Sequence, residues 1–181
     1  MNVIFLDFDG VLNTVHHGLI KDIEERIKLL GVFCEELNCK VVIEASMKDA
    51  IDEDTLETDS EYVREILDLF KKYNIDCIGR TPTVEKETKD GVWYPIWKED
   101  EIRLYLYRHP EIDHYCIIDD DDFHDLKKVK NHLVTTIYYS RRPEEEGLLP
   151  KHKEEIKKVL KKDNLFQKYV LKRQKNSNLQ M

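Results

Sequence analysis

The feature that most constrains the fold is the alternation of short apolar runs with longer segments of helical periodicity. Val3–Phe8 is a short apolar run that contains Asp7 and is followed by Asp9, and the next segment has apolar residues at helical spacing from Ile23 to Leu37. Further strand-like runs lie at residues 40–43, 75–78, 115–118 and 132–138. This alternation predicts an α/β fold with a mostly parallel central sheet and helices on both faces.

Helical spacing continues between the later strand-like runs. It predicts helices around Tyr62–Tyr73, Ile102–Leu106 and Ile156–Leu160, the last of them opened by Pro150. Residues 48–59 are acidic and without periodicity, which predicts a loop. Residues 80–97, which contain two prolines and a glycine, predict a long surface loop or a small hairpin.

The length of 181 residues fits one domain, which we expect to occupy residues 1–165, followed by a basic and partly disordered tail over residues 166–181. The apolar runs are too short for a transmembrane helix, and no basic region precedes the first one. The four cysteines form no CxxC pair. We therefore expect reduced thiols, a cytoplasmic location and no membrane partner.

Charge is divided unevenly along the chain. The formal net charge is −8, but residues 1–150 carry −15 and residues 151–181 carry +7. One interpretation of the basic end is a solvated helix face followed by a frayed tail. The other is an electrostatic arm that holds a nucleic acid near an acidic domain.

Acidic residues follow two of the predicted strands. Asp7 and Asp9 end the first run before Gly10, and Asp119–Asp122 follow the run at 115–118. Ligand sites of such folds lie beyond the carboxyl ends of the strands, so these carboxylates are expected to converge. Oxygen ligands without histidine or cysteine favour Mg²⁺, which binds through a few carboxylates and a substrate phosphate.

Three motifs resemble the haloacid dehalogenase (HAD) superfamily. Val3–Asn13 resembles its first motif, hhhhDxDGVLN, Lys98 resembles its basic third motif, and Ile117–Asp121 resembles its acidic fourth motif. The resemblance covers about residues 1–162 and is greatest to the small capless HAD domains of RNA-repair multidomain proteins. It implies a Rossmannoid three-layer sandwich without a large cap, and a hydrolase domain over residues 1–165.

The resemblance also implies roles for individual residues. Asp7 would be the nucleophile that forms an aspartyl-phosphate, and Asp9 would protonate the leaving oxygen and then activate water. Asp7, the backbone carbonyl of Asp9 and Asp119 would hold Mg²⁺, with Asp120 acting through water. Lys98 would screen the phosphoryl charge, and Arg80, which directly follows the third predicted strand, is the rival candidate. Gly10 belongs to the substrate-binding loop.

The second motif departs from the family pattern. The family places Ser or Thr directly after the second strand to donate to a phosphoryl oxygen, whereas this chain has Glu44-Ala45-Ser46-Met47-Lys48. Either Ser46 takes that role from a shifted loop, with Glu44 and Ala45 beside the substrate, or the site is altered. Glu44 must then point away, pair with Lys48 or Lys98, or be held neutral.

The expected function is Mg²⁺-dependent hydrolysis of a phosphomonoester. Without a large cap, the site is open to a nucleotide, a nucleic-acid end or a phosphoprotein. Trp93, Tyr94 and Trp97 would either stack on a base or anchor their loop to the core. The alternative is a catalytically altered HAD fold that binds RNA or a protein partner.

Overall fold

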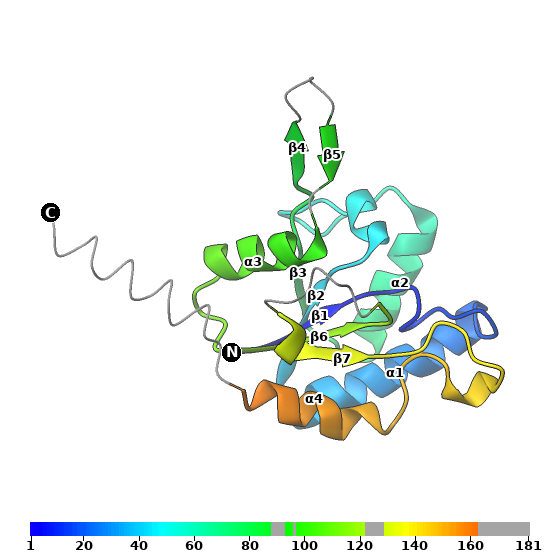
Figure 1. The fold of residues 1–181 in the computed structure, drawn as a ribbon. Coiled ribbons are helices and arrows are strands. Elements are labelled where there is room, and N and C mark those ends of the chain that lie inside the picture. Colours follow the sequence, from blue (N-terminus) through cyan, green and yellow to red (C-terminus); the bar gives the residue numbers. More distant parts are fainter. Residues whose placement is uncertain (88–92, 96, 122–128, 163–181) are drawn as a thin grey trace, which may run out of the picture.

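A five-stranded parallel sheet forms the centre of the molecule (Figure 1). The computed structural model describes residues 1–87, 93–95, 97–121 and 129–162. The strand order is β3-β2-β1-β6-β7. The strands are β1 (Asn2–Leu6), β2 (Cys39–Ile43), β3 (Cys77–Arg80), β6 (His114–Asp119) and β7 (Leu133–Thr135). The predicted α/β fold with a parallel sheet is therefore confirmed.

Side chains of successive strand residues enter two separate cores. Ile4 and Leu6 of β1 belong to one core, and Val3 and Phe5 belong to the other. This alternation follows from the two-residue repeat of a strand. Both faces of the sheet are apolar because helices cover both of them, as the continuous apolar runs of the sequence indicate.

Among the described residues, three helices cover one face of the sheet and one helix covers the other (Figure 1). The first face carries α1 (Ile20–Leu37), α2 (Glu61–Lys72) and α4 (His152–Leu160). The second face carries α3 (Lys98–Arg108). The short 3-10 helices are η1 (Ser46–Ala50), η3 (Lys130–His132) and η4 (Pro143–Glu145).

Local chemistry sets where the helices begin and end. Asn38 adopts the left-handed conformation, with φ of 51°, and ends α1 immediately before β2. Ser60 begins α2 by accepting a hydrogen bond from the backbone N–H of Val63 at 3.4 Å. The first residue of α3 is Lys98. The start of α3 thereby brings a cation to the carboxyl edge of the sheet.

The two points where a cap domain would be inserted hold short segments, residues 7–19 and 81–97. The second segment contains an antiparallel pair, β4 (Glu85–Glu87) and β5 (Trp93–Pro95), which projects from the body beside α3 (Figure 1). Of the long surface loop or small hairpin predicted for residues 80–97, the structure forms the hairpin, and both segments are short, as expected of a fold without a large cap. Side chains of Trp93 and Tyr94 lie outside the described residues.

Some predicted boundaries shift. The third strand starts at Cys77 instead of residue 75, and the fifth ends at Thr135 instead of residue 138. Tyr62, expected on the buried face of its helix, is 45% exposed and packs edge-on against Phe8, with ring centroids 6.1 Å apart. The reason is that Tyr62 lies in the first turn of α2, beyond the edge of the apolar core.

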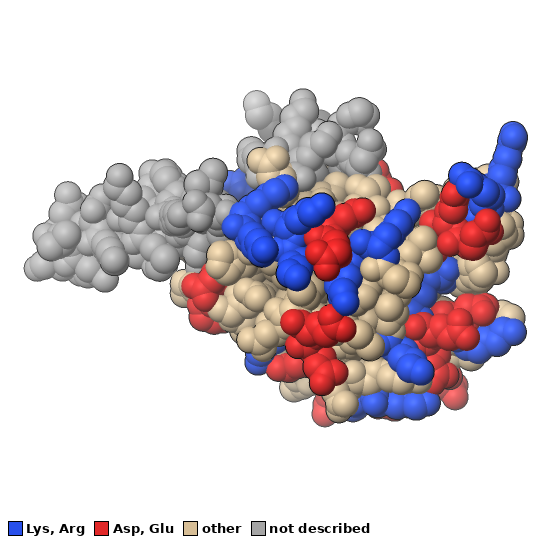
Figure 2. Space-filling view, turned by 90° about the horizontal axis from the view of Figure 1, so that it is seen from below, with Lys and Arg blue, Asp and Glu red and all other residues tan. Residues whose placement is uncertain are grey.

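The basic end of the sequence begins in α4. Residues 151–162 carry six lysines and two glutamates, whereas the expected tail at 166–181 lies outside the described residues. Basic and acidic side chains alternate over the face that carries α1 and α4, with Lys and Arg gathered where the described chain ends (Figure 2). Among the described helices, none has the length and apolar character needed to cross a bilayer.

The orientation of α1 can be tested with two substitutions on that helix. Ile27 is fully buried and Val32 is 42% exposed. Ile27→Ala is expected to lower the free energy of unfolding by about 2 to 5 kcal/mol because it leaves a cavity. Val32→Ala is expected to change it by less than about 0.5 kcal/mol. Urea denaturation measures both free energies of unfolding. Equal losses for the two substitutions would contradict the orientation of α1 with Ile27 buried and Val32 exposed.

Candidate active site

The carboxyl edge of the sheet brings together residues that are far apart in the sequence. Leu6 pairs with Ile43 on one side and with Ile118 on the other, so Asp7 lies between Glu44 and Asp119. Phe5 and Ile117 belong to the core beneath α3. Because side chains alternate, Asp7 and Asp119 point to that same face, toward α3.

Lys98 joins the two aspartates. Its Nζ lies 3.1 Å from Oδ1 of Asp7 and 2.9 Å from Oδ2 of Asp119. The Asp119 side chain is almost fully buried, and that of Asp7 is 9% exposed. Two buried carboxylates repel one another, and a shared ammonium group is what makes their approach tolerable.

This environment shifts the pKa values of the cluster. Burial, together with the charge of Asp119, raises the pKa of Asp7 to about 7, although Lys98 opposes the shift. Burial alone would lower the pKa of Lys98, but its two carboxylate partners raise it above the usual value. Burial and Asp119 also raise the pKa of Asp120. Further positive charge would therefore stabilise the ionised cluster.

The donor set fits a hard cation. Carboxylate oxygens of Asp7, Asp119 and Asp120 lie within 4.8 Å of one another. Gly10, with φ of 77°, passes so close that a Cβ there would lie 2.1 Å from Cγ of Asp120. Glycine is thus required for Asp120 to reach the cluster. Oxygen donors of this kind fit Mg²⁺.

The family model for the HAD domain in Swiss Army Knife RNA repair proteins matches residues 3–140. The chain belongs to this family of HAD domains. The match confirms the predicted superfamily, its RNA-repair subgroup and the Rossmann-like architecture, and it supports a phosphohydrolase at the level of the superfamily. Comparison with curated proteins and with solved structures gave no match.

Asp9 of this HAD domain lies apart from the three clustered carboxylates. Its side chain is exposed, and Nδ2 of Asn13 donates to its Oδ1 at 2.7 Å. The same loop is held by a hydrogen bond from Gly10 N to Asn13 O at 2.6 Å. Asn13 therefore orients an acid that faces solvent at the mouth of the site.

Arg80 and Lys98, the two candidates for the basic residue, lie on opposite faces of the sheet. Arg80 is in register with Ile43, which belongs to the core on the α1 side. Its Nε donates to Ile51 O at 2.6 Å, and it borders a hollow of about 1470 Å³ beside the loop that precedes α2. The structure brings Lys98, not Arg80, to the aspartates.

Ser46 and Ala45 lie at the start of η1. Ser46 is exposed and Ala45 is buried, and the carbonyl of Ala45 accepts a hydrogen bond from Lys48 N at 2.9 Å. The exposed hydroxyl of Ser46 is thus placed at the same edge of the sheet as the carboxylates. Its role as the phosphoryl donor stays a prediction.

Glu44 is fully buried in a polar network beside the aspartates. It accepts a short hydrogen bond from the hydroxyl of Thr81, and its Oε2 lies 3.6 Å from Nζ of Lys48. Lys48 also donates to Thr81 at 3.1 Å and forms an ion pair with Glu101 of α3. Pairing with Lys48 is one of the arrangements that the sequence left open.

The network leaves Glu44 with an unusual ionisation. Burial raises its pKa to about 7, against the opposing effects of Lys48 and Thr81. Among the described atoms, Oε1 of Glu44 is buried and has no hydrogen-bond partner. A protonated Glu44 can donate from this oxygen, as the serine or threonine of the family pattern would.

Thr81, the hydrogen-bond partner of Glu44, and Glu101, the ion-pair partner of Lys48, belong to this network but were not predicted from the sequence. Thr81 directly follows β3 and aligns with Glu44 at the end of the neighbouring strand. Glu101 lies one turn after Lys98. A residue directly after a strand of the sheet is a candidate for the site. Thr81 did not stand out in the sequence because the third strand was predicted over residues 75–78, whereas it spans Cys77–Arg80.

The raised pKa of Glu44 predicts a pH-dependent effect of Glu44→Gln. Its pKa is about 7 in the folded protein and about 4.5 for an ordinary glutamate, so the unfolded chain ionises first. As pH rises from about 4.5 to 7, this group therefore lowers the free energy of unfolding. Glu44→Gln removes that loss, so its melting temperature relative to the native protein should be higher at pH 8 than at pH 5. A difference in melting temperature between Glu44→Gln and the native protein that is the same at pH 5 and pH 8 would contradict the raised pKa of Glu44.

Proposed function

We propose that this HAD domain hydrolyses a phosphomonoester through an aspartyl-phosphate on Asp7, with Mg²⁺ as cofactor. The observation that supports this most is the bridge from Lys98 to Asp7 and Asp119, with Asp120 in the same cluster. A carboxylate nucleophile beside an ammonium group divides phosphoryl transfer into two displacements.

The chain's own residues provide most of the chemistry. The side chains of Asp7, Asp119 and Asp120, with the backbone carbonyl of Asp9, would hold the cation. When bound, Mg²⁺ supplies positive charge that offsets the repulsion between a carboxylate and a phosphate dianion. Lys98 favours the ionised form of Asp7 and orients the carboxylate through the contact at 3.1 Å.

Asp9 is proposed as the acid and base of the reaction. As Asp7 attacks phosphorus, Asp9 gives its proton to the leaving oxygen. In the second step Asp9 takes a proton from the water that attacks the aspartyl-phosphate, which restores both carboxyl groups. Exposure at the mouth of the site and the hydrogen bond from Asn13 suit this role.

The phosphoryl-binding groups differ from the family pattern. We assign the role of hydroxyl donor to Ser46, or to a protonated Glu44 through its unpartnered oxygen. Ala45 adjoins both residues, and Gly10 admits Asp120 to the cluster. Arg80 lies on the opposite face of the sheet from Asp7. Arg80 could therefore contact only a substrate long enough to reach from Asp7 across the edge of the sheet to that face.

Among the substrates left open by the sequence, we propose a nucleic-acid end. The family carries the description of RNA repair proteins, and the edge of the sheet holds only short insertions where a cap would be. The predicted contribution of the basic tail concerns residues outside those described. The alternative, a binding module that has lost turnover, is supported by the carboxyl group of Glu44 at the position of the usual hydroxyl.

Asp7→Asn is expected to abolish turnover and to leave the melting temperature within a few degrees. Asparagine keeps the shape but is no anionic nucleophile, and the substitution removes one acid from a crowded cluster. Hydrolysis of an aryl phosphate, nucleotides and phosphorylated oligonucleotides with and without Mg²⁺ measures the effect, with Asp68→Asn on α2 as the matched control. Retention of more than about 1% of native activity would contradict the nucleophile.

The same panel separates the two candidate functions. Hydrolysis by the native protein that depends on Mg²⁺ supports the phosphohydrolase. Lack of turnover on every substrate, combined with a Mg²⁺-dependent rise in melting temperature, would instead favour the binding module. In that case nucleic-acid binding should survive Asp7→Asn.

A further inference from the structure

Two loops beside the candidate active site are fastened to each other. One is residues 13–19, which follow Asp9, and the other is residues 136–142, which follow β7. Val15 N donates to Tyr138 O at 3.2 Å. Buried Glu146 accepts from His16 N at 3.1 Å and from Ser140 N at 2.8 Å, and thus connects both loops.

The Glu146 carboxylate is negatively charged where it joins the two loops, a place that we call the junction at Glu146. Burial alone would raise its pKa, but the N–H groups of Ser140 and His16 and the His16 ring bring it down to about 2. Nδ1 of His16 lies 2.7 Å from the carboxylate. The two loops therefore form one preorganised surface instead of two independent segments.

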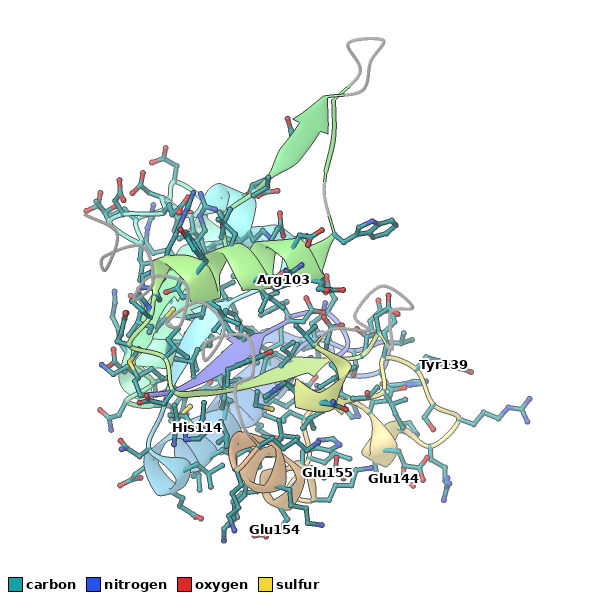
Figure 3. All side chains as sticks on the ribbon, turned by 60° about the vertical axis from the view of Figure 1, so that its left-hand side comes forward. Arg103, His114, Tyr139, Glu144, Glu154 and Glu155 are labelled. Carbon is teal, nitrogen blue, oxygen red and sulfur yellow. The ribbon has the colours of Figure 1, made fainter. Side chains whose placement is uncertain are left out.

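This surface exposes large apolar side chains. Exposed fractions are 52% for Val15, 38% for Ile137, 44% for Tyr138 and 60% for Tyr139. We call these four residues the tyrosine platform. Figure 3 shows Tyr139 pointing outward at the end of the sheet opposite to His114, the first residue of β6. Neighbouring exposed apolar groups of this kind mark interaction sites.

The tyrosine platform begins directly beside the candidate metal ligands. Thr136 N donates to Asp119 O at 3.0 Å, and the Thr136 hydroxyl donates to Gly10 O at 2.7 Å. Tyr138 and Tyr139 follow within three residues, which an extended chain spans in about 10 Å. A ligand held at the aspartates by its phosphate would therefore reach the tyrosines with its next groups.

The chemistry of the platform indicates the kind of ligand. The rings of His16 and Tyr139 are stacked, with centroids 5.7 Å apart and planes 24° apart, so a flat base can extend an existing stack. Arg141 and Arg142 follow the tyrosines in the chain, with Arg142 in an ion pair with Glu145 at 2.6 Å, and three glutamates come next at positions 144–146. Stacking aromatics combined with arginine suit a single-stranded nucleic acid.

We propose that the tyrosine platform binds the single-stranded segment of a nucleic acid whose terminal phosphate lies at Asp7. Tyr138 and Tyr139 stack on the nucleotides next to the phosphorylated end, and Arg141 contacts a backbone phosphate. This inference rests on the proposed phosphohydrolase function for the position of the terminal phosphate.

The test measures binding and turnover separately. Binding of labelled hexanucleotides, RNA and DNA, with a phosphate at the 5′ or the 3′ end, is measured on Asp7→Asn so that no substrate is consumed. Tyr138→Ala and Tyr139→Ala are each introduced into the Asp7→Asn protein. Each loss of a ring is expected to weaken oligonucleotide binding by about 5- to 100-fold. Tyr139→Phe should retain affinity because stacking needs the ring and not the hydroxyl.

The matched control is Tyr107→Ala. Tyr107 is 54% exposed on α3, nine residues from Lys98 and about 14 Å along the helix axis. Its substitution should change binding by less than about twofold. In proteins with Asp7 intact, the ratio of kcat/KM for the oligonucleotide to that for an aryl phosphate should fall with Tyr139→Ala by the same factor as binding.

The outcomes distinguish this inference from the proposed function. Phosphorylated hexanucleotides that are hydrolysed equally well by native and Tyr139→Ala proteins would overturn the platform and leave the phosphohydrolase intact. Tyrosine-dependent binding without turnover on any phosphomonoester would support the platform and overturn the phosphohydrolase. A native dimer in sedimentation that Tyr139→Ala dissociates would assign the surface to contact between copies and overturn the platform.

Discussion

The ion pairs of Lys98 with Asp7 and Asp119 are the interaction on which the site depends. Two buried carboxylates on neighbouring strands would repel one another, and the ammonium group at the start of α3 is placed between them at 3.1 and 2.9 Å. This contact determines where α3 must begin. α3 itself packs on the second face of the sheet, whereas the other described helices, α1, α2 and α4, pack on the first.

The second polar network extends the same principle to Glu44. Its carboxyl group replaces the usual hydroxyl, and it lies in one polar network with Lys48 of η1, Thr81 directly after β3 and Glu101 of α3. Together the two networks place alternating acids and bases along the edge of the sheet. A buried carboxyl with a pKa of about 7 can donate or accept a hydrogen bond near neutral pH.

The sequence predicts the mostly parallel α/β fold with helices on both faces of the sheet, and the convergence of Asp7 with Asp119, because parallel strands carry these patterns locally. It also predicts Lys98, though through resemblance to a family and with Arg80 as rival. It could not decide between these two cations, since the face on which Arg80 lies depends on the register of β3 and the irregularity between Val41 and Val42. Lys48 is among the partners that the sequence predicts for Glu44, whereas Thr81, Glu101 and the junction at Glu146 bring together segments far apart in the sequence, so these contacts depend on the tertiary structure.

The central claim is that Asp7 carries the phosphoryl group, and chemical trapping tests it directly. The native protein is mixed with Mg²⁺ and a phosphomonoester labelled in its phosphoryl group, quenched in acid during turnover, and digested for mass spectrometry. We expect a hydroxylamine-sensitive phosphoryl group on the peptide that contains Asp7, and none on the Asp7→Asn protein. Turnover without any covalent label, or a label on another residue, would contradict it.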